Sequence, residues 1–223
     1  MRLVMFSLDT LVNMPRLFSY AMLNAAKDNS PANGWTRESF LELLAQTDCD
    51  LRKAVENICG AHEQQYMEGD YVTLDFLRDG TMFATQWSKY LERCKKVIGR
   101  DAGKCVKAMG HLLLSRLAKM RFDVGVFYPM EDATVKRVVD NAGLNVRTFI
   151  GYKTEPPHTL DIPWGELEGE LGGALSRAEE SWLVVPAGNQ RFAKLAARSK
   201  AQYVECSESY QAPIARLHQV LNW

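Results

Sequence analysis

The sequence predicts an α/β protein, a Rossmann-like parallel sheet sandwich with an all-helical cap inserted after its first strand. Three observations support this prediction. An apolar run at residues 2–6 ends in a polar stretch, helical periodicity runs through residues 14–120, and apolar runs alternate with helical segments after residue 120. Strands separated by helices are typical of parallel sheets, because each crossover helix carries the chain back to the edge where the next strand begins.

The first strand is predicted at residues 2–6, which are rich in strand formers and continuously apolar after Arg2. A strand with this pattern is typically buried on both faces. It is followed by Ser7-Leu8-Asp9-Thr10, where the chain opens into a polar loop. Open α/β sheets bind their ligands outside the carboxyl ends of the strands, so Asp9 is a candidate site residue.

The segment after the first strand is predicted to be helical. In its last helix, apolar residues recur at three- and four-residue steps from Cys105 to Leu117, which leaves lysines and arginines on the opposite face. We therefore divide the chain into a core, residues 1–13 and 119–223, and a helical cap, residues 14–118. The helices expected in the cap and at its border cover residues 14–27, 36–46, 50–66, 80–98 and 102–120.

Strands return after residue 120, and together with the first strand they predict a right-handed βαβ sheet that is covered on both faces. Residues 151–178 follow no clear period and are expected to be irregular. The predicted strands are residues 123–128, 145–150, 181–185 and 202–206, and the predicted helices are residues 131–142, 189–200 and 212–221.

Composition excludes several classes of protein. The chain has 223 residues, of which 47% are hydrophobic and 24% charged, as in packed globular domains. Basic and acidic residues number 27 each, so no net charge attracts nucleic acid or an anionic membrane. No run approaches the roughly 20 apolar residues that span a bilayer, and the N-terminal run is too short for a signal peptide. We therefore expect a cytoplasmic protein that does not bind membranes.

Four stretches of the predicted core resemble, in order, the motifs of haloacid dehalogenase (HAD)-like phosphatases. Phe6-Ser7-Leu8-Asp9-Thr10-Leu11-Val12 resembles the first motif, which reads hydrophobic-Asp-x-Asp-Gly-Thr-Leu-Val. Residues 123–128 resemble the strand that leads to the second motif, and residues 182–189 resemble the strand and loop of the fourth. Lys153-Thr154-Glu155-Pro156-Pro157 resembles the lysine–proline third motif. The resemblance implies a HAD-like core and places its functional residues in these stretches.

The resemblance assigns catalytic positions to three residues. In the family, the first aspartate attacks phosphorus, and the aspartate two positions later transfers the leaving-group proton. Here Ser7 occupies the nucleophile position and Asp9 the acid/base position. Lys153 matches the lysine that balances the charge of the nucleophile and the phosphate. Because serine is a poor nucleophile without a base, turnover by the family's route is not expected.

The residues expected around a ligand also depart from the family pattern. Tyr128 matches the serine or threonine of the second motif, and its side chain is too long for the same contact. Asn189 and Arg191 stand where the fourth motif has carboxylates that hold magnesium, and Thr10 follows Asp9 in the first motif. Because Mg²⁺ prefers carboxylate oxygens and Arg191 would repel a cation, we expect neither a bound metal nor another cofactor.

The sequence therefore favours a catalytically degenerate HAD-like protein, a pseudophosphatase that binds a partner protein or a small anionic ligand. The alternative is an unconventional, metal-independent hydrolase that uses Asp9 as its acid/base. A third hypothesis is an interaction module that uses basic residues such as Lys104 and Lys107, because Asp101 is the single acid among many basic residues at 94–121. Nucleic-acid binding is disfavoured, since few aromatic side chains are interleaved with these basic residues.

Overall fold

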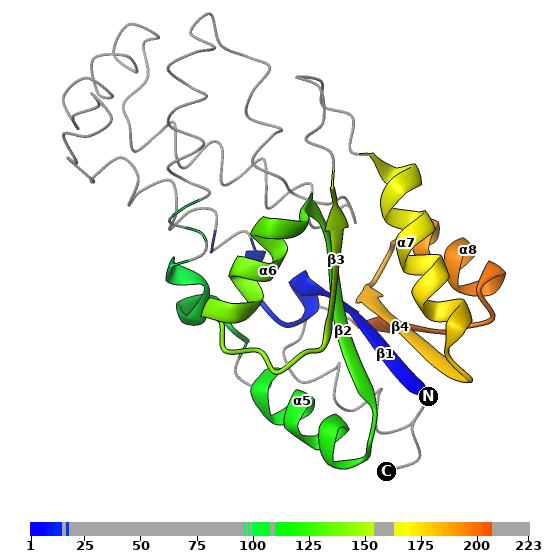
Figure 1. Ribbon diagram of the computed structural model, residues 1–223, viewed down its shortest axis with the longest axis horizontal. Coiled ribbons are helices and arrows are strands. Elements are labelled where there is room, and N and C mark those ends of the chain that lie inside the picture. The colour runs from blue at the N-terminus through cyan, green and yellow to red at the C-terminus, as the bar shows by residue number, and fades with distance from the viewer. Residues whose placement is uncertain are drawn as a thin grey trace, which may run out of the picture.

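The computed structural model describes residues 1–14, 17, 96, 98, 100–107, 110–153 and 163–206. These residues form a five-stranded sheet with the strand order β3-β2-β1-β4-β5, in which all neighbouring strands are parallel (Figure 1). The strands are β1 (Arg2–Ser7), β2 (Asp123–Glu131), β3 (Thr148–Tyr152), β4 (Glu180–Pro186) and β5 (Gln202–Cys206). The Rossmann-like parallel sheet that the sequence predicts is confirmed.

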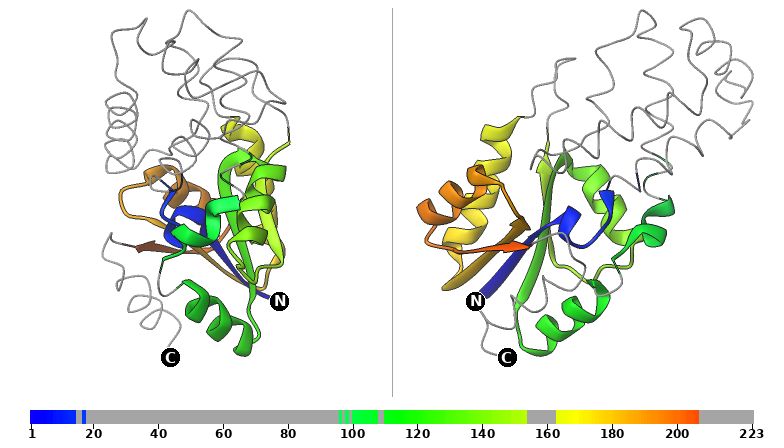
Figure 2. Two further views of the ribbon diagram at one scale, coloured as in Figure 1. Left: turned by 90° about the vertical axis from the view of Figure 1, so that its left-hand side faces the viewer. Right: turned by 180° about the vertical axis from the view of Figure 1, so that it is seen from behind.

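Helices cover both faces of this sheet. One face is covered by α5 (Gly110–Lys119) and α6 (Asp132–Asn141), and the other by α7 (Trp164–Arg177) and α8 (Gln190–Arg198) (Figure 2). The chain moves outwards from β1 through β2 to β3 and then crosses to β4 and β5, on the other side of β1. Right-handed crossovers that run in opposite directions place their helices on opposite faces. The reversal of direction makes the carboxyl end of β1 the point where ligands bind in open α/β sheets.

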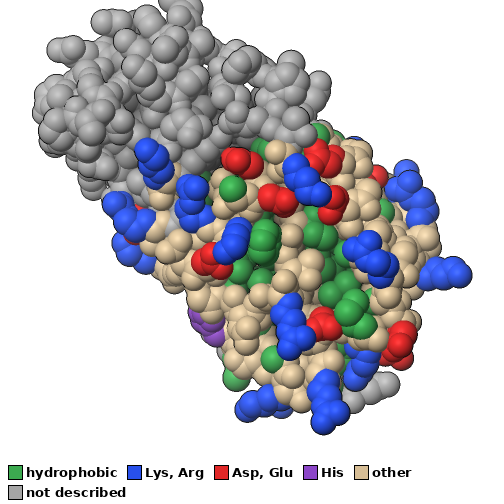
Figure 3. Space-filling view, viewed as in Figure 1, with side chains coloured by type: hydrophobic (Ala, Val, Ile, Leu, Met, Phe, Trp, Pro, Cys, Tyr) green, Lys and Arg blue, Asp and Glu red, His purple; other side chains and the backbone are tan. Residues whose placement is uncertain are grey.

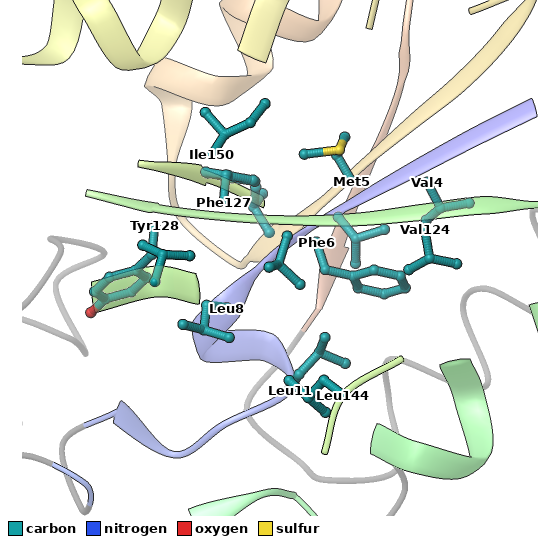
Figure 4. Packing of buried hydrophobic residues seen from close by; sticks show 14 of the residues in the cluster. Val4, Met5, Phe6, Leu8, Leu11, Val124, Phe127, Tyr128, Leu144 and Ile150 are labelled. Atoms are coloured by element: carbon teal, nitrogen blue, oxygen red, sulfur yellow. The ribbon is translucent and has the colours of Figure 1, made fainter. Parts of the chain in front are cut away.

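The central strand β1 is buried on both faces. In Figure 4, Val4 and Phe6 lie on the same side of the sheet as Val124, and Met5 lies on the opposite side. The side chain of Met5 fills the space over Gly125 of β2, where a Cβ atom would lie 2.3 Å from the Met5 sulfur. This packing fixes the position of β1, and therefore the position at which the following loop begins at the edge of the sheet.

The single helix predicted at residues 102–120 is wrong, because the structure divides it. A short 3-10 helix, η4 (Ala102–Cys105), is followed by Val106 in an extended conformation, and α5 begins at Gly110. The break is caused by pairing with a distant segment, since Val106 forms an antiparallel bridge with Val12. Helical periodicity is a local signal and cannot reveal such a pairing.

The irregular stretch expected up to residue 178 is also corrected, because residues 164–177 form the helix α7. Leu167, Leu171, Ala174 and Leu175 are its buried residues and follow helical spacing. Glycines interrupt this apolar stripe and have the lowest helix propensity after proline, so the period is obscured in the sequence. Tertiary packing of the leucine face outweighs that propensity.

The third strand begins later than predicted, at Thr148 rather than residue 145. The preceding helix α6 ends in a turn in which Gly143 has a φ of +64° and the amide of Leu144 donates to the carbonyl of Val139. This is the hydrogen-bond pattern of a helix that is capped by a glycine in the left-handed conformation. Residues 145–147 connect this cap to β3, and the amide of Arg147 donates to the carbonyl of Val124 in β2.

The division into a core and a helical cap stays a prediction. The structure shows α5 packed against β2, on the sheet face that α6 also covers. The helices predicted at residues 14–27, 36–46, 50–66, 80–98 and 212–221 lie outside the described residues, apart from isolated positions at their ends. In the part of the chain that is described, no helix has the length and apolar character that crossing a bilayer requires.

Candidate functional site

The polar loop after β1 is a short 3-10 helix, η1 (Leu8–Thr10), at the edge where the parallel strands have their carboxyl ends, here called the carboxyl edge. The amides of Leu11 and Val12 both donate to the carbonyl of Leu8, at 3.0 and 2.8 Å. The Thr10 hydroxyl donates to the carbonyl of Ser7 at 2.6 Å. The side chain of Thr10 thus helps to hold this turn closed.

Asp9 lies inside this turn and is only 3% exposed. Burial raises the pKa of Asp9 from 3.8 to about 6, because a carboxylate loses its hydration there. A hydrogen bond from the Ser7 side chain, the positive charge of Lys107 and the backbone amides of Asp9 and Thr10 act in the opposite direction. The carboxyl group therefore ionises close to neutral pH while it contacts a hydroxyl and lies within the field of a lysine.

Lys107 is a member of this site that sequence reasoning missed. Its amide donates to the carbonyl of Leu11 at 2.8 Å, and the amide of Asn13 donates to the carbonyl of Cys105 at 2.8 Å. Residues 11–13 and 105–107 thus form a short antiparallel pair, here called the neck, around the bridge between Val12 and Val106. In the sequence, Lys107 falls on the basic face of a predicted helix, and no local pattern connects it to Asp9.

Lys153 follows β3 at the carboxyl edge, but its contacts are with α7. Its ammonium nitrogen lies 2.5 Å from Oε1 of Glu170, and its amide donates to Glu166 at 2.7 Å. The hydrogen bond and the negative charge of Glu170 raise the pKa of Lys153. The lysine that the resemblance assigns to the site therefore remains charged while an ion pair holds it on a neighbouring helix.

Arg191 is held in a similar way, at the start of α8. Its guanidinium lies 2.8 Å from Oε1 of Glu168 and 4.6 Å from the centre of the Trp164 ring, both residues of α7. Asn189, just before α8, accepts a hydrogen bond at its backbone carbonyl from the Tyr203 hydroxyl, at 2.9 Å. The contacts of Arg191 thus join α7 to α8, and those of Asn189 join the loop to β5.

Tyr128 of β2 is fully buried and belongs to the hydrophobic core. In Figure 4 its ring lies beyond Leu8, and its hydroxyl oxygen points away from the other labelled side chains.

Of the residues proposed from the sequence, the structure brings Ser7, Asp9 and Thr10 together in one turn. The roles assigned to Lys153 and to the residues around the ligand stay predictions.

Charges on the described surface are mixed in sign. On the face seen in Figure 3, Lys and Arg side chains are interspersed with Asp and Glu side chains over much of that surface. Pairs such as Lys136 with Asp140, at 2.6 Å, account for part of this mixing. A mixed surface exerts little long-range attraction on a charged ligand, so the charges next to Asp9 matter more for recognition than the overall field.

The donors of the turn after β1 and of the loop after β4 do not fit a magnesium ion. Ser7 offers a hydroxyl and Asp9 one carboxylate, and the loop Ala187–Asn189 after β4 carries no carboxylate. Within the described residues there is no group of three histidine, cysteine, aspartate or glutamate side chains placed to hold a metal. Mg²⁺ binds hard oxygen ligands in a near-ideal octahedron, for which a single carboxylate is a weak anchor.

Comparisons with known proteins agree with the HAD-like architecture. No protein-family model matches the sequence, and no curated protein matches it either. A hydrolase from Streptococcus pneumoniae has a similar structure, with a TM-score of 0.51 and 12% identity over 100% of this chain and 98% of that one. A structure from Bacillus subtilis whose name describes it as a HAD hydrolase, YfnB, bound to magnesium has a TM-score of 0.55 and 12% identity, again over 100% and 98% of the two chains.

The chain therefore has the fold of HAD-like hydrolases, as its sequence motifs imply. At 12% identity the likeness concerns the fold alone. One fold supports many activities, so the function has to be argued from the residues at the carboxyl edge.

Proposed function

We propose that this protein binds a small anion at the carboxyl edge, beside Asp9, and does not carry out the phosphoryl transfer of HAD-like phosphatases. One observation carries the proposal. The residue at the end of β1, Ser7, is buried, and its side chain is hydrogen-bonded to Asp9. The nucleophile position is thus occupied by a neutral hydroxyl that is engaged with the only carboxylate of the turn.

The chemistry of Ser7 supports this proposal. A carboxylate nucleophile is ionised at neutral pH and forms an acyl phosphate, which water cleaves readily. A serine hydroxyl needs a base to become nucleophilic, and the resulting phosphate ester is far more stable toward water. The carboxyl group of Asp9 is a weak base, because burial raises its pKa only to about 6. Even a phosphorylated Ser7 would therefore turn over slowly.

The surroundings of Asp9 favour an anion over a cation or a protein partner. Lys107 brings a positive charge, whereas the hydroxyl protons of Ser7 and Thr10 are already donated, to Asp9 and to the Ser7 carbonyl. In its protonated form Asp9 is also a donor. The side chains of Ser7, Asp9 and Thr10 are small and lie within one turn at the carboxyl end of a strand, where open α/β sheets hold small ligands. A protein partner would instead need a broad contact surface.

The proposal is tested by a binding assay and a turnover assay on the same preparation. Phosphate and vanadate should raise the melting temperature, by about 3–6 °C at ten times the dissociation constant. At neutral pH the shift should be at least as large in Asp9→Asn, which removes a negative charge next to the anion, and it should be unchanged in the surface control Asp140→Asn. p-Nitrophenyl phosphate should not be hydrolysed with or without magnesium. Magnesium-dependent hydrolysis that disappears in Asp9→Asn would refute the proposal.

A second candidate function is a metal-independent hydrolase in which Asp9 acts as a general base toward water. The observation in its favour is the pKa of Asp9, which at about 6 is close to the pH at which a general base works well. A screen of phosphate esters and haloacids in the presence of a chelator separates the two functions. Activity that survives the chelator and is lost in Asp9→Asn supports the hydrolase, and uniformly negative results support the binding protein.

A further inference from the structure

We propose that Lys107 provides the fixed positive charge of the anion site beside Asp9, in the role that the HAD motifs assign to Lys153. The inference rests on the proposed function and adds the residue that selects for a negatively charged ligand. It also means that the positively charged side chain of the site comes from the neck, and not from the end of β3.

The backbone of the neck fixes the position of Lys107. Its amide is bound to the carbonyl of Leu11, two residues after Asp9 in the chain. The adjacent bridge between Val12 and Val106 sets the register of the two segments, and Val12 is completely buried. The side chain of Lys107 is partly exposed. A lysine on a fixed backbone beside the turn, with access to solvent, can reach both Asp9 and a ligand that enters from outside.

The electrostatics at Asp9 agree with this geometry. The positive charge of Lys107 lowers the pKa of Asp9, so this charge acts on the carboxyl group of the site. Of the two strands that pack against η1, β4 ends in Val184-Val185-Pro186 and β2 ends in Glu131. Burial, the Ser7 side chain and the backbone amides of Asp9 and Thr10 also act on this pKa.

The other cations considered for this role are neutralised by carboxylates. Lys153 forms its ion pair with Glu170, and Arg191 forms one with Glu168. To bind an anion, either cation would have to leave a carboxylate that it already contacts. Lys107, in contrast, exerts its charge on the carboxyl group of the candidate site itself, so an anion that binds there meets this positive charge.

The test measures phosphate binding to the full-length protein by calorimetry at low and moderate salt. Lys107→Met should weaken binding at least tenfold and should reduce its salt dependence, because one charge contact is lost. Lys119→Met removes the same charge at the end of α5, next to the amino end of β2, and should leave the affinity unchanged. Lys153→Met should have an effect of less than threefold.

A second measurement, made without ligand, distinguishes the loss of the Lys107 charge from a folding defect of the variant. The pKa of the Asp9 carboxyl group, followed by carbon NMR, should rise in Lys107→Met and stay constant in Lys119→Met, because removal of a nearby positive charge disfavours the carboxylate. If Lys107→Met binds phosphate as tightly as the wild type, or if Lys153→Met alone loses binding, the assignment to Lys107 is overturned. A wild-type protein that binds neither phosphate nor vanadate refutes the proposed function, and the anion role of Lys107 falls with it.

Discussion

Replacing Asp9 by asparagine should stabilise the protein, and the gain should depend on pH in a defined direction. Burial raises the pKa of Asp9 from 3.8 to about 6, so the folded state holds this proton more tightly than the unfolded state does. The carboxyl group therefore favours folding most at low pH, and that contribution is lost as the pH rises from about 4 through about 6. The asparagine variant has no proton to lose and escapes this penalty.

The magnitude follows from the size of the pKa shift. A difference of about 2 pKa units corresponds to about 3 kcal/mol, which is an upper value for the gain of Asp9→Asn at pH 7. For a chain of this length, 3 kcal/mol raises the melting temperature by about 6–12 °C. At pH 4 the wild-type carboxyl group is largely protonated in the folded state, and the gain should fall below about 1 kcal/mol. Urea denaturation at pH 4, 5, 6 and 7 measures this profile.

Asp101 is the matched control, because it is also a buried carboxyl group but has the opposite shift. Its burial alone would raise its pKa, and hydrogen bonds and charge from Lys104 and Arg100 outweigh that effect, so the pKa of Asp101 is lowered. Its ionised form supports folding above about pH 4, and that support is lost as the pH falls. Asp101→Asn should therefore destabilise the protein, more at pH 7 than at pH 4. A gain for Asp9→Asn that is constant with pH, or that grows toward low pH, would refute the reasoning.

Further substitutions test the packing and the ion pairs by urea denaturation. Gly151→Ala should lower the free energy of unfolding by about 2 kcal/mol or more, since its Cβ atom would lie 2.2 Å from a carbonyl oxygen of β2. Gly169→Ala, which has nothing within 4 Å, should raise it by about 0.5–1 kcal/mol. Phe192→Ala removes a buried ring that packs on β2 and should cost about 3–5 kcal/mol. Glu170→Gln should change stability by less than about 1 kcal/mol, yet lower the pKa of Lys153 measured by NMR.

The parts of the fold that the sequence predicts best are those coded by local pattern. The strand at residues 202–206 is predicted with its observed bounds. The strands β1 and β4 are predicted to within one residue at each end, because continuous apolar runs mark strands that are buried on both faces. The helix α7 was missed because its glycines obscure the leucine stripe. The break at Val106 was missed because it is caused by pairing with Val12, which is distant in the sequence.

The same distinction applies to the candidate site. Ser7, Asp9 and Thr10 could be found from the sequence because they are adjacent and follow a buried strand. Lys107 could not, because it reaches the turn only through the backbone pairing of the neck. The ion pair between Lys153 and Glu170 was equally hidden, since it joins residues from opposite ends of a stretch that showed no period.

The helix α7 holds basic residues of other elements in ion pairs. Its glutamates contact three basic residues from other elements, since Glu170 binds Lys153 and Glu168 binds both Arg191 and Arg198. Two of these basic residues begin at the carboxyl edge, after β3 and at the start of α8. Once α7 neutralises them, the charge balance at Asp9 depends on the neck, so substitutions in the neck should affect ligand binding more than substitutions in the third-motif loop.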